Sequence, residues 1–215
     1  MTTRDRASAA PAWLGDLAAA AAAMDEPRPL RPPALGGRRS AVLILFGDGP
    51  DGPDLLFIQR GEGRRRHAGQ PAFPGGAIED GDEGPVGAAL REAAEETGLD
   101  PGGVEVLGTL PELYITRSGF RVVPVLAWWR EPTAVRPVDI GEVAAVERVP
   151  VAALANPGCR VMLRHPSGRT GPAFRIGSML IWGFTALLVD RLLALAGWER
   201  PWDAAAVAEL PEGAA

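Results

Sequence analysis

The sequence predicts a mixed α/β fold built around one main domain, and three observations support this prediction. Short apolar runs typical of buried strands alternate with longer runs typical of helices. Of the 215 residues, 47% are apolar, which is enough for a sizeable core. The 27 glycines and 21 prolines gather mainly in the stretches between these runs. We therefore expect a mixed sheet layered between helices, as an α/β/α sandwich.

The expected elements follow in chain order. An Ala-rich amphipathic helix near residues 13–24 precedes a Pro-rich stretch, 25–37, that reads as an extended linker. Strands are expected at 41–46, 55–59, 72–73, 104–110, 121–129 and 142–149, and helices at 85–97, 151–155 and 181–195. Residues after 201 form an Ala/Glu-rich tail. The predicted division is a segment 1–38, a domain 39–200 and a tail 201–215.

One glycine pattern imitates a nucleotide-binding loop. Gly47, Gly49 and Gly52 spell G-x-G-x-x-G after a predicted strand. The dinucleotide fingerprint requires a helix next, whereas Pro53 and another strand-like run follow here. The pattern therefore predicts a hairpin turn.

Composition excludes several classes of protein. The net charge of −5 argues against a strongly basic nucleic-acid binder. The single cysteine, Cys159, excludes an internal disulfide framework and a cysteine-based zinc site. The absence of lysine excludes Walker-type phosphate binding and Schiff-base catalysis. Asp16 interrupts the first apolar run, and the run 179–189 is too short to cross a bilayer, so we expect a cytoplasmic protein.

The most informative segment is the acidic helix that contains Arg91-Glu92-Ala93-Ala94-Glu95-Glu96. At about 100° per residue, its three carboxylates share a sector about 100° wide. Glu92 and Glu96 repel each other at i,i+4, yet clustered carboxylates suit Mg²⁺ or Mn²⁺. The alternative is an ordinary Glu-rich surface helix. A Gly-rich turn and an acidic loop, residues 73–83, precede the helix and favour a pocket for cations and phosphate.

These residues resemble the Nudix hydrolase family, whose box reads G-x5-E-x7-R-E-U-x-E-E-x-G-U, where U is aliphatic. The matching positions are Gly76, Arg91, Glu92, Glu95, Glu96, Gly98 and Leu99. Asp82 stands at the first glutamate of the box, with eight residues before Arg91 instead of seven. Aligning Glu83 restores the spacing but places Ala77 at the glycine, so a one-residue insertion is the simpler alignment.

A second signature resembles the coenzyme A pyrophosphatase subgroup, roughly L-L-T-x-R-[SA]-x3-R-x3-G-x3-F-P-G-G. It matches here at Leu56, Arg60, Arg65, Gly69 and residues 73–76, and His67 and Gln70 also look like the subgroup. Phe57, Ile58 and Gly61 depart from it. Segments 118–125, 142–143 and 181–186 are similar to the subgroup too, so the resemblance covers about residues 39–195.

The resemblance implies hydrolysis of coenzyme A or acyl-CoA to 4′-phosphopantetheine, or its acyl form, and adenosine 3′,5′-bisphosphate. It implies Mg²⁺ or Mn²⁺ as cofactor, with Glu92 and Glu96 as first ligands and Glu95 next. Glu95 and Glu96 are also expected to be catalytic.

Other residues receive supporting roles from the same resemblance. Arg91 is expected to orient a glutamate by a bidentate ion pair. Glu142 is a candidate general base, or only closes a loop. Gly75 and Gly76 let the backbone approach metal or phosphate. Three residues are expected to contact substrate, although for the arginines a solvated charge run is the alternative: Arg60, Arg65 and Gln70.

Two other functions stay open at this point. The chain could act on another nucleoside diphosphate derivative, such as NADH or ADP-ribose. It could instead be a Nudix-fold ligand sensor without turnover, which the retention of all three helix glutamates disfavours. The expected partner is a small-molecule substrate, with no nucleic acid or membrane, and a homodimer is a possible assembly, since dimers are the commonest homo-oligomers.

Overall fold

The computed structural model describes residues 9–24, 33, 36–61, 69–116 and 118–211. They fall into two compact units. Unit 1 comprises residues 1–48 and 74–135, and unit 2 comprises residues 49–73 and 136–215. Most of the predicted linker 25–37, together with Arg65 and His67, lies outside the described residues.

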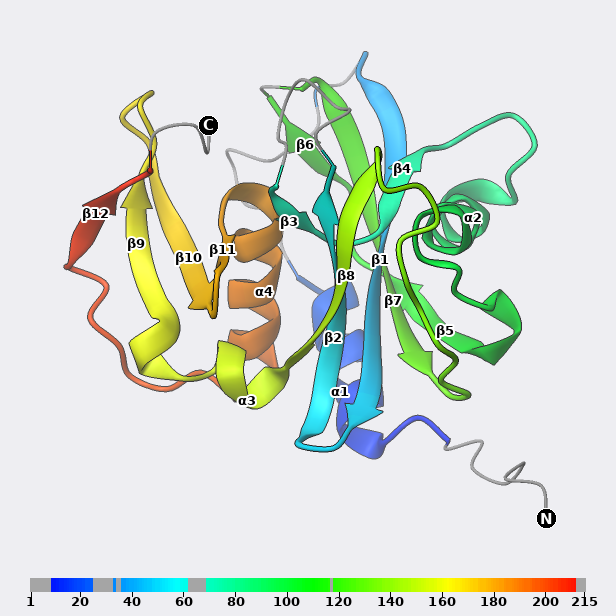
Figure 1. The fold of residues 1–215 in the computed structure, drawn as a ribbon, viewed down its shortest axis with the longest axis horizontal. Coiled ribbons are helices and arrows are strands. Elements are labelled where there is room, and N and C mark those ends of the chain that lie inside the picture. The colour runs from blue at the N-terminus through cyan, green and yellow to red at the C-terminus, as the bar shows by residue number, and fades with distance from the viewer. Residues whose placement is uncertain (1–8, 25–32, 34–35, 62–68, 117, 212–215) are drawn as a thin grey trace. The chain divides into compact units, whose positions relative to one another are not determined.

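Unit 1 contains a mixed sheet and two helices (Figure 1). The elements are α1 (Ala12–Ala22), β1 (Arg38–Gly49), β4 (Gly75–Ala77), α2 (Gly84–Thr97), a 3₁₀ turn (Pro101–Gly103), β5 (Val104–Thr109), β6 (Leu113–Ile115) and β7 (Phe120–Trp129). β1 runs parallel to β7 and antiparallel to β4, while β5 and β6 pair antiparallel with β7. The predicted mixed α/β class is confirmed.

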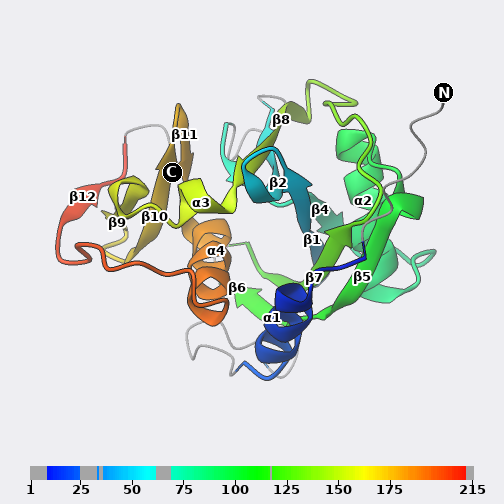
Figure 2. The ribbon, with the colours of Figure 1, turned by 90° about the horizontal axis from the view of Figure 1, so that it is seen from below.

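Helices cover both faces of the central strands of unit 1. α1 buries Leu14, Leu17 and Ala21, and the Trp13 ring meets the Phe46 ring edge-on at 5.5 Å between centroids. α2 packs against β4 and β7. Figure 2 shows α1 and α2 on opposite sides of β1 and β7. Both of these strands are buried at successive residues, as expected for strands that are covered on two faces.

Unit 2 contains two groups of strands and two helices. The elements are β2 (Gly52–Arg60), β3 (Pro71–Ala72), β8 (Val143–Pro150), α3 (Val151–Leu154), a 3₁₀ turn (Pro157–Cys159), β9 (Arg160–Arg164), β10 (Thr170–Ile176), β11 (Met179–Ile181), α4 (Gly183–Leu195) and β12 (Val207–Glu209). β2 pairs antiparallel with β3 and β8. β9, β10 and β11 form an antiparallel sheet, which α4 contacts through β10 and which β12 extends in parallel to β9.

Most predicted elements are present within one to three residues of their expected ends. The turn at residues 50–51 leads into β2, so the G-x-G-x-x-G pattern is a turn between strands, as expected. The helix predicted at residues 181–195 was placed to start too early. Residues 179–181 form β11 instead, and α4 begins at Gly183. A short apolar run fits either a strand or a helix, and here pairing with β10 decides for the strand.

Several strands were not expected at all: β4, β6, β9, β10 and β12. Three of them have only three residues, which is too short for a periodic pattern. Among the described residues, no helix combines the length and the apolar composition that crossing a bilayer requires.

Candidate active site

The glycine turn before the acidic helix lies in a tight space. β4 places Gly75 opposite Val42 and Gly76 opposite Ala41 of β1. A Cβ at Gly75, which has φ +156°, would clash with the carbonyl oxygen of Ala41 and come within 2.7 Å of the Val42 Cα. A Cβ at Gly76 would clash with the Glu92 carboxylate. Gly75 is therefore required where the backbone passes β1, whereas a side chain at Gly76 would displace the Glu92 carboxylate from this turn.

The acidic helix begins and ends where the sequence predicts. Pro85 lies in its first turn, and Gly98 closes it in the left-handed conformation at φ +70°, with its N–H donated to the Ala94 carbonyl. Ala88, Ala89 and Ala93 are fully buried on the packed face. The small alanine side chains let the helix approach the sheet closely, which fixes the position of its carboxylate edge.

The three carboxylates of this edge differ in exposure. Glu96 is buried at 6% exposure and accepts the Gly75 N–H at 2.9 Å. Glu92 is 15% exposed at its side chain and lies against Gly76, whereas the Glu95 side chain is 59% exposed. The hydrogen bond from a backbone N–H to an ionised carboxylate is of the stronger, charge-assisted kind. Glu92 and Glu96 are therefore held at the glycine turn, whereas the Glu95 side chain extends into solvent.

Arg91 joins the acidic loop to the acidic helix. Its guanidinium makes a bidentate pair with Asp82, with Nε donating to Oδ1 at 2.8 Å and Nη2 to Oδ2 at 3.1 Å. The Nη2 group also donates to the Ala77 carbonyl at 3.0 Å. The Nη1 group donates to Glu92 at 3.2 Å and to Glu95 at 3.0 Å. Arg91 thus orients two helix glutamates, but its bidentate partner is an aspartate.

Asp82 is a site residue that the sequence-based assignment left out. Its side chain is only 6% exposed, and it also accepts the Glu79 N–H at 2.8 Å. The hydrogen bond from Arg91, followed by that backbone bond, lowers the pKa of the Asp82 carboxyl, and Asp82 in turn raises the pKa of Arg91. The exposed Glu83 makes no side-chain cap bond. This geometry favours the alignment with Asp82 and a one-residue insertion.

The donor set of this edge fits a hard divalent cation. Among the described residues, no three histidine, cysteine or carboxylate side chains converge into a preformed metal centre. Glu92 and Glu96 nevertheless present oxygen atoms beside the same glycine turn. Mg²⁺ is commonly held by one or two carboxylates and completes its shell with water and substrate phosphates. These residues therefore suit a cation that completes its coordination with substrate phosphates and water better than one whose ligands all come from the protein.

Three predicted residues of unit 2 come together through their backbones. The Arg60 N–H donates to the Gln70 carbonyl at 3.1 Å, and the Gly69 N–H donates to the Arg60 carbonyl at 2.7 Å. The Gly61 N–H donates to the Glu142 carbonyl at 2.7 Å. Arg60, Gln70 and Glu142 therefore cluster at the end of β2. The roles expected for them, and for Arg65 outside the described residues, stay predictions.

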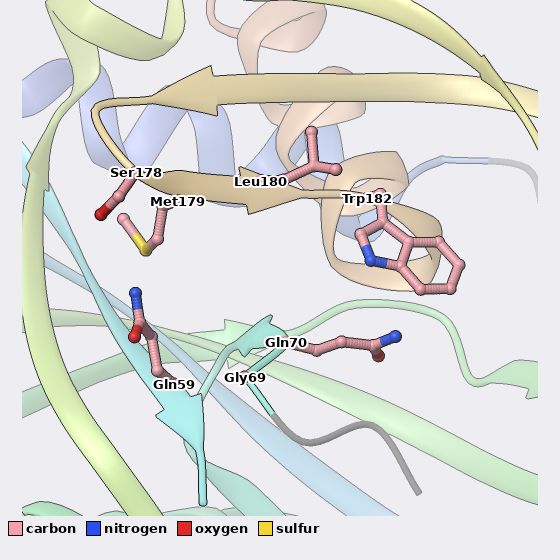
Figure 3. Close-up of a pocket in the computed structure, with 7 residues that line it drawn as sticks. All are labelled: Gln59, Gly69, Gln70, Ser178, Met179, Leu180 and Trp182. Atoms are coloured by element: carbon pink, nitrogen blue, oxygen red, sulfur yellow. The ribbon is translucent and has the colours of Figure 1, made fainter. Parts of the chain in front are cut away.

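The same end of β2 borders a pocket of about 210 Å³ (Figure 3). Its lining comes from β2, from the segment before β3, and from β11 with the residues flanking it: Gln59, Gly69, Gln70, Ser178, Met179, Leu180 and Trp182. Only Gln70 was expected at a binding site. The sequence did single out residues 181–186 as a segment similar to the coenzyme A subgroup, which was the available signal for Trp182.

Comparisons with known proteins agree with this geometry. The family model for the NUDIX domain matches residues 37–165. The chain is 38% identical over 165 residues to NudL of Escherichia coli K12, described as an uncharacterized Nudix hydrolase. The match covers 74% of this chain and 82% of that protein. NudL of Shigella boydii serotype 4 gives the same values. The chain belongs to the Nudix hydrolase family.

Two solved structures are also similar to this chain. The Nudix hydrolase RenU of M. smegmatis is 28% identical, with a TM-score of 0.46, over 56% of this chain and 75% of RenU. DR0079 of Deinococcus radiodurans is 16% identical, with a TM-score of 0.48, over 74% of this chain and 86% of that protein. Nudix hydrolases as a family act on nucleoside diphosphate derivatives and generally use divalent metal ions.

Proposed function

We propose that this Nudix hydrolase cleaves the pyrophosphate bond of coenzyme A or acyl-CoA. The products are 4′-phosphopantetheine, or its acyl form, and adenosine 3′,5′-bisphosphate. The observation that carries the hydrolytic part is the pair Glu92 and Glu96, held against the glycine turn by Gly75 and Gly76. The substrate rests on the second signature, whose Arg60 and Gly69 lie hydrogen-bonded at the end of β2. We expect this enzyme in the cytoplasm, with a homodimer as one possible assembly.

Each residue of the acidic edge has a distinct task in the proposed reaction. Bound Mg²⁺ or Mn²⁺ would be held by Glu92 and Glu96, with Glu95 as a third ligand, and would neutralise phosphate charge and acidify a water. Arg91 holds Glu92 and Glu95 in place, because each accepts one of its Nη1 hydrogens. Asp82 fixes Arg91 from the other side. The arginine therefore positions carboxylates and does not itself bind substrate.

The chemical step needs a proton acceptor. The oxygen of water forms a bond to one phosphorus, the bond from that phosphorus to the bridging oxygen breaks, and the water proton passes to a base. Glu142 is the proposed base, and it directly precedes β8. If Glu142 only closes the loop that hydrogen-bonds to Gly61, its replacement by glutamine will leave the rate within about threefold of wild type.

Arginines suit the remaining charge of the proposed substrate. The adenosine part of coenzyme A carries a 3′-phosphate in addition to the pyrophosphate. Guanidinium groups bind phosphate with two parallel hydrogen bonds, so Arg60 and Arg65 are proposed to contact it. A substrate without this phosphate, such as dephospho-coenzyme A, would then bind less tightly to the wild type.

A product analysis tests the proposal. The protein is incubated with Mg²⁺ or Mn²⁺ and, separately, with coenzyme A, NADH or ADP-ribose, and the products are identified by mass spectrometry. We expect equal amounts of 4′-phosphopantetheine and adenosine 3′,5′-bisphosphate, formed faster than any product of the other two compounds. Faster cleavage of NADH or ADP-ribose would reject the substrate. Binding without turnover of any of the three would favour a ligand sensor.

A further inference from the structure

Two arginines at the start of β1 differ from the other arginines of unit 1. The structure describes five arginines in this unit, and three of them pair with carboxylates: Arg91 with Asp82, Arg121 with Glu112 and Arg130 with Glu131. The other two, Arg38 and Arg39, are exposed, and among the described residues no hydrogen bond or ion pair engages their side chains. Their positive charge is therefore available to an anion from outside the chain.

Arg38 is held in place although it is exposed. Its guanidinium carbon lies 5.1 Å from the centroid of the Phe120 ring, and the two residues are direct partners in the parallel pairing of β1 with β7. A guanidinium that rests on an aromatic ring keeps its N–H donors free, in the planar fork that matches two phosphate oxygens. The ring therefore orients Arg38 in advance and lowers the entropy cost of binding a phosphate.

The face of β1 that carries Arg38 leads to the glycine turn of the acidic edge. Alternate residues of a strand point to the same face, so Arg38, Ser40 and Val42 form one row. The Val42 Cγ1 lies 3.0 Å from the position of a Cβ at Gly75, the residue that donates its N–H to Glu96. At about 3.3 Å per residue, Arg38 begins about 13 Å from this turn. All of these residues belong to unit 1, so their relative placement is fixed.

We propose that Arg38 binds the 3′-phosphate of the substrate while the pyrophosphate lies at the glycine turn. The inference rests on the function proposed above, because coenzyme A carries these two groups of negative charge one nucleotide apart. The contact lies within unit 1 and requires no residue of unit 2. Because the 3′-phosphate is the same in the ground state and the transition state, Arg38 lowers KM and leaves kcat unchanged.

Binding of two nucleotides tests the proposal without turnover. Adenosine 3′,5′-bisphosphate and adenosine 5′-monophosphate differ only in the 3′-phosphate, and their Kd values are measured by calorimetry with the full chain and Mg²⁺. Arg38→Met removes the charge and keeps an unbranched apolar side chain. We expect the Kd of the bisphosphate to rise about tenfold, the size of a hydrogen bond to a charged group, and that of the monophosphate to stay within twofold. Arg39→Met is the matched control, because Arg39 is equally exposed but points to the opposite face of β1, and both Kd values should stay within twofold.

A second measurement follows turnover of coenzyme A and of dephospho-coenzyme A, which lacks the 3′-phosphate. In Arg38→Met we expect the KM for coenzyme A to rise about tenfold, with kcat within twofold. The KM for dephospho-coenzyme A should stay within twofold of the wild-type value. A purely structural role of Arg38 would change both substrates alike, so the difference between them identifies the phosphate contact.

The outcomes separate this proposal from the proposed function. Unchanged Kd values in Arg38→Met, or equal losses for the bisphosphate and the monophosphate, overturn the assignment of Arg38 and leave the hydrolase proposal standing. Arg117, between β6 and β7 in the sequence, lies outside the described residues, and a selective loss in Arg117→Met alone would also overturn the assignment. Absence of coenzyme A cleavage by the wild type overturns the substrate. If Arg38→Met still loses only bisphosphate binding in that case, the phosphate site survives it.

Discussion

Replacing Glu96 by glutamine removes the negative charge of the buried carboxylate and keeps the size and shape of the side chain. The glutamine oxygen can still accept the Gly75 N–H, so the turn keeps its main contact with the helix. We expect the free energy of unfolding to change by no more than about 2 kcal/mol. The lost charge matters far more to a bound cation. One unit charge about 4 Å from a divalent cation contributes about 8 kcal/mol at an effective dielectric constant of about 20. Losing even half of this from the transition state, about 4 kcal/mol, lowers turnover about a thousandfold.

The assay compares hydrolysis of coenzyme A at saturating Mg²⁺ with urea unfolding of the same preparations. Glu83→Gln is the matched control, because Glu83 is an exposed carboxylate directly before the same helix and makes no cap bond. The control should keep wild-type activity within about twofold. A Glu96→Gln enzyme that retained more than a tenth of wild-type activity would refute the assignment of Glu96 as a ligand. Loss of activity with a collapse in stability would instead show a structural role.

The remaining predictions concern ion pairs and one tight contact. Asp82 has a pKa lowered from 3.8, so its pair with Arg91 stabilises the fold above about pH 4 and is lost as acid protonates it. The stability gap between wild type and Asp82→Asn, measured by chemical unfolding, should therefore narrow on acidification, and a constant gap would contradict this. Arg160→Met should cost about 3 kcal/mol in urea unfolding, because the buried guanidinium pairs with Asp190; a loss under about 1 kcal/mol would argue against it. Gly61→Ala should destabilise by about 1–3 kcal/mol, since a Cβ there would clash with the facing backbone carbonyls, and an unchanged melting temperature would disprove the contact.

Periodic patterns and end signals made α2 predictable from sequence. Apolar residues at helical spacing, Pro85 at the start and Gly98 at the end gave its bounds within one residue. The shared edge of Glu92, Glu95 and Glu96 follows from helical geometry alone. The glycines at residues 75 and 76 were visible as a motif, but the contacts that surround them were not. The Ala41 carbonyl and the Glu92 carboxylate that fill the space come from distant parts of the chain.

Contacts between distant segments set the limit of the sequence analysis. The pair of Asp82 with Arg91 depends on how the acidic loop folds back on the helix, which spacing alone left open between Asp82 and Glu83. The pocket joins β2 to β11, more than a hundred residues apart, so no local pattern indicates it. The departure of Gly61 from the subgroup signature also has a physical cause, because the backbone of residues 140–141 leaves no room for a Cβ.

A crystal of the protein soaked with Mn²⁺, measured at the manganese absorption edge, tests the central claim most directly. The acidic edge of α2 should bind the ion, so we predict an anomalous peak within coordination distance of the carboxylates of Glu92 and Glu96. The Glu96→Gln crystal, soaked in the same way, should lack that peak. A wild-type crystal with no manganese at this edge, or with manganese bound only elsewhere, would contradict the account.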